Sequence, residues 1–139
     1  MKLWLVYALL SAFFASLTAI LAKVGIKGID SDLATGIRTS VILIFILLII
    51  FFRGQFHNLA TLSKTNLLFI SLSGIATGLS WIFYFRALQL GKVSLVAPID
   101  KASLALTILL SVIFLGEAIS IKSAMGAGLI LAGTLILIF

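Results

Sequence analysis

Two adjacent charged residues, Asp100 and Lys101, lie within an otherwise apolar stretch of the sequence. Ionisable side chains at the centre of a membrane-spanning helix cost about 2.5–3.5 kcal/mol on insertion scales, so those that occur there commonly have a function. Pro98 precedes the pair and cannot donate a main-chain hydrogen bond, which leaves a carbonyl of the preceding turn without its helical partner. An aspartate at such a position has the chemistry to bind a proton or a cation, or to pair with a charged substrate.

Hydroxyl side chains follow Asp100 at helical spacing, in the order Ser103, Thr107 and Ser111. Residues three and four apart share one face of a helix. The sequence therefore predicts one polar stripe that lines a central cavity.

The alternative interpretation of Asp100 is a structural ion pair. Lys101, Arg38 and Arg86 each supply a cation that could neutralise the carboxylate. Alternating topology puts Arg38 and Arg86 at the same membrane face as Asp100, and Lys101 would extend its ammonium group to the interface. The residues alone leave both interpretations open.

Aromatic residues lie near the end of the preceding apolar segment. Trp81 and Tyr84 have the chemistry to line a site for an organic substrate, although Trp and Tyr near helix ends are also interface anchors. The full set of predicted substrate-binding or coupling residues is Asp100, Lys101, Arg38, Trp81, Tyr84, Ser103 and Thr107.

Motifs for other chemistry are missing from the sequence. It contains no phosphate-binding GxxxxGK[ST] loop, no HExxH and no GxSxG. There is no cysteine, and the single His57 has no cluster of metal ligands around it in the sequence. We therefore expect no enzyme activity, no catalytic residue, no metal site and no cofactor.

The composition indicates a membrane protein. Hydrophobic residues make up 63% of the chain and charged residues 10%, whereas soluble domains are roughly 45–50% apolar and about 25% charged. The apolar runs do not alternate with polar residues as the strands of a β-barrel would. The net charge of +6 comes from basic residues between apolar runs, so the expected partner is membrane lipid and not nucleic acid.

Five apolar segments each approach the roughly 20 residues that cross about 30 Å of hydrocarbon. We expect transmembrane helices at residues 3–22, 33–52, 67–88, 94–115 and 121–139. The connections are short, so residues 1–139 are predicted to form a single all-α, polytopic domain of the inner (cytoplasmic) membrane. Small residues recur in four of the segments, as in the GxxxG pair Gly74 and Gly78, which predicts close helix packing.

The third to fifth segments resemble the EamA-like unit of the drug/metabolite transporter superfamily. The resemblance is carried by Tyr84-Phe85-Arg86-Ala87-Leu88, residues 93–98, Leu115-Gly116-Glu117, Gly126 and Gly133. It implies a transporter of small organic metabolites or drugs. The related four-helix small multidrug resistance proteins carry a glutamate in their first helix, and residues 3–22 contain no acid, which argues against a proton-coupled exporter of that type.

Typical members of this superfamily have two such units in opposite orientations, whereas this sequence has one. If five helices alternate across the membrane, four Lys and Arg residues lie at one face and six at the other. Because a Lys/Arg bias sets orientation, so small a difference permits insertion both ways. Two antiparallel copies would rebuild an inverted-repeat transporter, with substrate near the midplane between the third and fourth helices of both copies.

Other arrangements stay open at this point. The chain could insert in one orientation, with its six-charge face in the cytoplasm. It could pair with a different half-unit. It could also be a non-transporting membrane subunit that packs into a larger complex through its small-residue faces.

Overall fold

Helices account for the regular secondary structure. The structure is a computed structural model and describes residues 2–139, with the main chain alone at residues 58 and 60. Within this range there is no strand, and five helical segments are long and apolar enough to cross a membrane: Leu3–Gly25, Ser31–Phe52, Lys64–Leu90, Val93–Leu115 and Ile121–Ile138. The prediction of an all-α protein with five transmembrane helices is confirmed.

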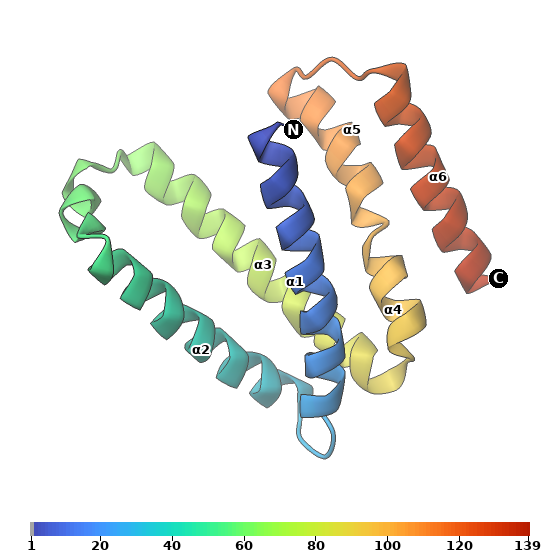
Figure 1. Cartoon of the computed structure of the whole chain (residues 1–139), viewed down its shortest axis with the longest axis horizontal. Helices are drawn as coiled ribbons and strands as arrows, with labels where there is room; N and C mark the ends of the chain where they lie inside the picture. The colour runs from blue at the N-terminus through green and yellow to red at the C-terminus, as the bar shows by residue number, and fades with distance from the viewer. Residues whose placement is uncertain (1) are drawn as a thin grey trace. The chain divides into compact units, whose positions relative to one another are not determined.

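The elements follow one another along the chain with short connections (Figure 1). They are α1 (Leu3–Gly25), α2 (Ser31–Phe52), the 3₁₀ helix η1 (Gln55–Thr61), α3 (Lys64–Leu90), α4 (Val93–Asp100), α5 (Ser103–Leu115) and α6 (Ile121–Ile138). The polar connection between the second and third spans contains η1, which the sequence did not predict. The expected fourth helix is divided into α4 and α5.

Local sequence signals set several of these helix ends. The Asp30 carboxylate accepts hydrogen bonds from the main-chain N–H groups of Asp32 (2.8 Å) and Leu33 (3.2 Å), which satisfies two of the donors that begin α2. Gly54 and Gly116 have φ angles of 62° and 66°, a left-handed conformation that glycine adopts without strain. Gly54 follows the end of α2 and Gly116 ends α5.

The chain divides into two compact units, and each is described by itself. The α2–α3 unit comprises Leu21–Leu90, and the α4–α6 unit comprises residues 2–20 together with residues 91–139. The prediction that the whole chain forms one domain stays a prediction.

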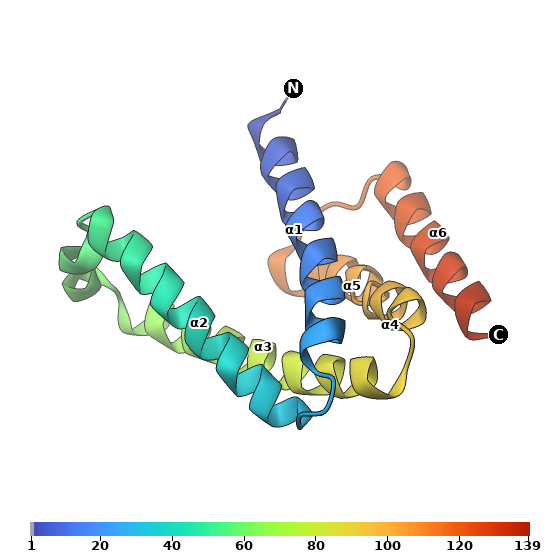
Figure 2. The same ribbon diagram turned by 60° about the horizontal axis from the view of Figure 1, so that its bottom comes forward.

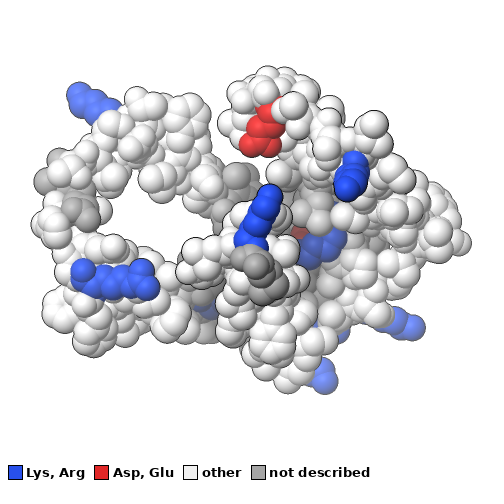
Figure 3. Space-filling view, turned by 45° about the horizontal axis from the view of Figure 1, so that its top comes forward, with Lys and Arg blue, Asp and Glu red and all other residues white. Residues whose placement is uncertain are grey.

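In the α2–α3 unit, the two long helices lie side by side and η1 joins their far ends (Figure 2). Its buried apolar residues are Ile26, Ala34, Phe85 and Leu88, at the end where α2 begins and α3 finishes. The helices separate toward η1, and Figure 3 shows an open gap between them there. Packing within this unit is therefore concentrated at one end.

In the α4–α6 unit, α6 packs along both α4 and α5. Thr134 of α6 is buried, and its hydroxyl donates to the Ile130 carbonyl at 2.9 Å within its own helix. The same hydroxyl lies 3.5 Å from the Pro98 carbonyl oxygen of α4, which it reaches as a second, long hydrogen bond. This contact joins α6 to the part of the fourth span that precedes its interruption.

The glycine faces of α3 and α6 are open within their own units. A Cβ atom built on Gly74 or Gly78 of α3 would meet no atom within 4 Å, and the same is true of Gly126, Gly128 and Gly133 in α6. Within either unit, no neighbouring helix therefore packs closely against these glycines, and the close packing that the sequence predicted for these faces stays a prediction.

Candidate functional site

Asp100 and Lys101 form an ion pair at the interruption of the fourth span. The Lys101 ammonium donates to the Asp100 carboxylate, with 3.2 Å between Nζ and Oδ2. The Asp100 side chain is 36% exposed and the Lys101 side chain is 54% exposed. Because neither is sealed from its surroundings, the pair is accessible to a ligand, and Lys101 is the cation that the structure brings to Asp100.

The interruption is a short stretch of tighter winding. The Lys101 N–H donates to the Pro98 carbonyl and the Ala102 N–H to the Ile99 carbonyl, both at 3.0 Å. These bonds span three residues, as in a 3₁₀ helix, and such a stretch within a helix commonly marks a hinge or local strain. Pro98 lies within α4, three residues before Lys101. The residue without an N–H group is therefore close to the interruption but is not part of it.

The predicted polar stripe is divided by this interruption. Asp100 is the last residue of α4, and Ser103 is the first residue of α5. The Thr107 hydroxyl donates to the Ser103 carbonyl at 3.0 Å, and the Ser111 hydroxyl donates to the Ile108 carbonyl at 2.9 Å. The hydroxyls therefore bond to their own helix and retain acceptor capacity for a ligand.

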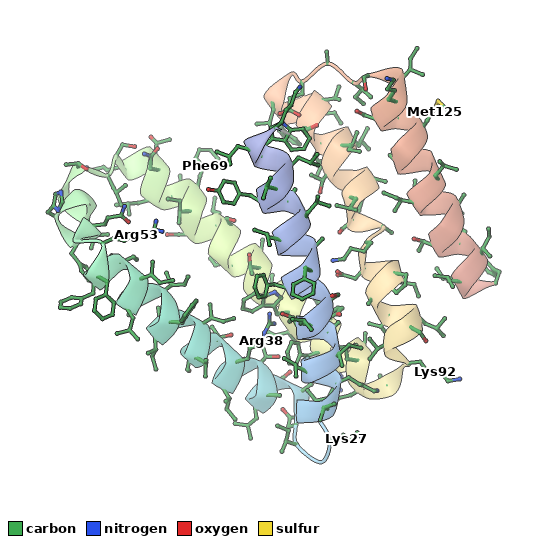
Figure 4. The ribbon with its side chains drawn as sticks, viewed as in Figure 1. Lys27, Arg38, Arg53, Phe69, Lys92 and Met125 are labelled. Carbon is green, nitrogen blue, oxygen red and sulfur yellow. The ribbon has the colours of Figure 1, made fainter. Side chains whose placement is uncertain are left out.

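Arg38 lies in the α2–α3 unit, where its side chain extends from α2 toward α3 (Figure 4). Its Cζ atom lies 4.3 Å from the ring centroid of Trp81 and 5.2 Å from that of Phe85. A guanidinium within about 6 Å of an aromatic face is attracted by the negative charge density of the ring. We call these three residues the Arg38 aromatic site.

The sequence predicted two of these residues and missed the third. Phe85 follows Trp81 by four positions on α3, and this spacing puts both rings on one helix face. That interval was visible in the sequence, but nothing there indicated which face would meet Arg38. The predicted residue Tyr84 contacts Phe85 in an edge-to-face arrangement, with 6.3 Å between the ring centroids.

A small open pocket lies at the turn between α1 and α2. It has a volume of about 260 Å³ and is lined by Lys23, Ile26, Lys27, Gly28, Ile29 and Gln89. The Lys23 ammonium donates to the Leu88 carbonyl near the end of α3, and the Gln89 amide donates to the Ile29 carbonyl at 2.7 Å. Since the C-terminal end of α3 carries negative partial charge, the Lys23 ammonium group that donates to it is favourably placed, and Lys23 also lies in the last turn of α1.

Metal ligands do not gather in the described structure. Among residues 2–139, no group of three or more His, Asp or Glu side chains could hold a metal ion.

An all-α chain with five membrane-spanning helices and an ion pair at an interruption of one of them fits a membrane transporter, since transporters commonly have discontinuous helices at their binding sites. Residues 2–139 match the EamA-like transporter family, and the chain belongs to that family.

Two similar proteins extend this finding. A protein from Sinorhizobium sp named "Uncharacterized transporter in cobO 3'region" is 48% identical over 134 residues, which cover 96% of this chain and 95% of that protein. An uncharacterized protein from Methanocaldococcus jannaschii is 26% identical over 133 residues, which cover 96% and 94% of the two chains. Both therefore have about the length of one five-helix unit. No solved structure matches the chain.

Proposed function

We propose that the protein transports small organic metabolites or drugs across the cytoplasmic membrane as an antiparallel homodimer of five-helix units. The observation that carries this proposal is the Asp100–Lys101 ion pair at the interruption between α4 and α5. Charged groups and irregular backbone within a membrane are tolerated where they line a cavity or a binding site.

The depth of the interruption supports a site near the midplane. The helix α4 has 8 residues, which at 1.5 Å per residue corresponds to about 12 Å of the span before the interruption. In secondary transporters, substrate and coupling-ion sites lie near the midplane at discontinuous helices. In our proposal, Asp100 and Lys101 bind substrate or a coupling ion, and Ser103 and Thr107 contribute hydroxyl groups.

Four features support the dimer. Few apolar side chains are buried within the chain, and the glycine faces of α3 and α6 are open. The two relatives also have the length of a single unit. An odd number of spans puts the ends of the unit on opposite membrane faces, as an inverted pair requires.

Transport measurements on Asp100→Asn test the site. Proteoliposomes that contain the purified protein would be screened with a panel of organic cations, anions and neutral metabolites. For any compound that is transported, we expect Asp100→Asn to lower the rate by about tenfold or more, as when an interaction with the moving charge is lost. The matched control is Glu117→Gln, which removes an acid from the exposed turn between α5 and α6. Unchanged transport by Asp100→Asn would remove this residue from the mechanism.

Reporter fusions test the orientation. A C-terminal reporter that is active only in the cytoplasm, and a second that is active only outside it, should both give signal if the chain inserts both ways. Signal from one side alone would exclude an antiparallel dimer of identical chains. A dimer with a different half-unit would then replace the antiparallel homodimer as the proposed arrangement.

A non-transporting subunit is the second candidate, and the open GxxxG face of α3 favours it. Gly74 and Gly78 could pack against a helix of a larger membrane complex. Absence of transport across the whole compound panel, together with co-purification of another membrane protein that Gly74→Leu abolishes, would favour this function.

A further inference from the structure

Arg38 has an unusual position for a cation in a membrane protein. It lies seven residues after Ser31, the first residue of α2, which puts its Cα about 10 Å along the helix. Its side chain extends toward α3 and contacts the rings of Trp81 and Phe85 (Figure 4). The guanidinium is therefore held over apolar rings within a span.

Within the α2–α3 unit, the hydrogen-bonding groups of Arg38 have no protein partner. Among the described residues of this unit, no carboxylate oxygen lies within 4.0 Å of the guanidinium, and none of its N–H groups donates a hydrogen bond. Arginine carries five such donors. The aromatic rings attract the positive charge but provide no lone pair for these donors.

The acidic side chains of the same unit form hydrogen bonds with other groups. Asp30 accepts from the first N–H groups of α2, and Asp32 accepts a hydrogen bond from the Ser31 hydroxyl at 3.3 Å. Arg38 is half-buried, so its N–H groups are still accessible from outside the protein. A half-buried cation with accessible, unused donors is complementary to a ligand that carries negative charge.

We propose that the Arg38 aromatic site binds the oxyanion of an organic acid. The carboxylate or phosphate accepts hydrogen bonds from the edge of the guanidinium, which matches such groups bidentately. The apolar body of the ligand lies against Trp81 and Phe85. This inference rests on the proposed function, and it makes the transported compound an organic acid. The phosphate of an anionic lipid has the same chemistry, so the experiment must separate the two sources.

Tryptophan fluorescence gives a direct test, because the sequence contains only Trp4 and Trp81. In a Trp4→Phe background, Trp81 is the only indole that reports. The probes are benzoate, benzyl alcohol and benzylammonium, which share a ring and differ in charge. In uncharged detergent, we expect benzoate to change the Trp81 emission saturably and the other two probes to have little effect.

Substitutions at Arg38 test whether the fluorescence response to benzoate depends on the guanidinium. Arg38→Gln should weaken benzoate binding by about tenfold or more, and Arg38→Lys by less, because lysine keeps the charge but loses the bidentate geometry. The matched control is Arg53→Gln, which removes the same charge just after the other end of α2 and should leave binding unchanged. Melting temperatures of all variants separate loss of binding from loss of folding.

Nanodiscs distinguish lipid from a free organic acid. If lipid is the source, phosphatidylglycerol added to phosphatidylcholine should shift the Trp81 emission in an Arg38-dependent way, and benzoate should not compete. If a free acid is the source, benzoate should bind equally in both nanodiscs. An equal response to benzylammonium, a response that survives Arg38→Gln, or no response to any probe would each overturn the oxyanion site.

Failure of the proposed oxyanion site can be distinguished from failure of the proposed transport function. Transport of a compound in proteoliposomes with no Arg38-dependent binding of anions would leave the transporter in place and overturn this inference. Arg38-dependent binding of benzoate without transport of any compound would support the oxyanion site and contradict the transport function.

Discussion

The guanidinium of Arg38 lies 4.3 Å from the ring centroid of Trp81, and this contact connects the first half of α2 with the second half of α3. Phe85 adds a second ring at 5.2 Å and is itself buried. The contact therefore borders the packed end of the α2–α3 unit, where the two helices are held together, and not the end near η1, where they separate.

A double-mutant cycle should detect the Arg38–Trp81 contact as an energetic coupling. Cation–π pairs contribute about 0.5–2 kcal/mol, with the larger values where the cation is shielded from water. Arg38→Gln and Trp81→Leu should therefore be non-additive by this amount in the free energy of unfolding, measured by denaturation in mixed micelles. Trp4→Leu, on exposed α1, serves as the control and should be additive with Arg38→Gln. Full additivity for both pairs would mean that the contact has no energetic role.

Much of this arrangement follows from composition, and part of it does not. The apolar runs predicted five spans, because the length of each run and the lack of charge in it leave few other environments. The same reasoning put Arg38, Trp81 and Asp100 within spans. It did not predict which residues would meet, because the rotation of one helix against another depends on packing that no single run encodes.

The interruption of the fourth span shows this limit most clearly. Pro98 predicted a free carbonyl, but the change to three-residue hydrogen bonds occurs at Lys101 and Ala102. Lysine and alanine are both good helix formers, so local propensity gives no reason to end α4 there. The Asp100–Lys101 pair coincides with the interruption, and the structure offers no further physical cause for its position.

Thr134 should stabilise the α4–α6 unit through its hydroxyl. Thr134→Val removes a buried hydroxyl that donates to its own helix and reaches the Pro98 carbonyl at 3.5 Å. Since a buried hydrogen bond contributes about 0.5–1.5 kcal/mol, a loss in the lower part of that range is expected from so long a contact. Thr107→Val is the matched control, because the Thr107 hydroxyl is exposed and bonds only within α5. Thermal unfolding should show a lower melting temperature for Thr134→Val alone, and equal shifts would contradict a role for the contact with Pro98.

Lys23 should stabilise the end of the α2–α3 unit by donating to the Leu88 carbonyl. Lys23→Met keeps much of the side-chain length and removes the charge. The expected cost is about 0.3–1 kcal/mol, the usual contribution of a cation near a helix C-terminus. Lys27→Met removes the same charge from the same turn and should cost less, because Lys27 is exposed and has no such contact. A Lys27→Met variant as unstable as Lys23→Met would assign the effect to the charge of the turn and not to the hydrogen bond.

The balance of positive charge makes the antiparallel dimer testable by complementation. Under alternating topology the wild-type faces carry four and six Lys or Arg residues. The first variant lowers the four-charge face to two, through Arg53→Gln and Lys64→Gln. The second variant reverses and widens the bias to eight against four, through Gln55→Lys, His57→Lys, Thr65→Lys, Asn66→Lys, Lys27→Gln and Lys92→Gln. Because such a bias sets the orientation of insertion, each variant should insert in one direction.

Neither biased variant should transport by itself, since each lacks a partner of opposite orientation, whereas co-expression of the two should restore transport. The reporter fusions measure the orientation of each variant independently of its activity, so an uninserted variant cannot be mistaken for an inactive one. Full transport by either variant alone, with its orientation confirmed as single, would rule out the antiparallel homodimer. It would leave a parallel assembly, or a pair with a different half-unit, as the transporting form.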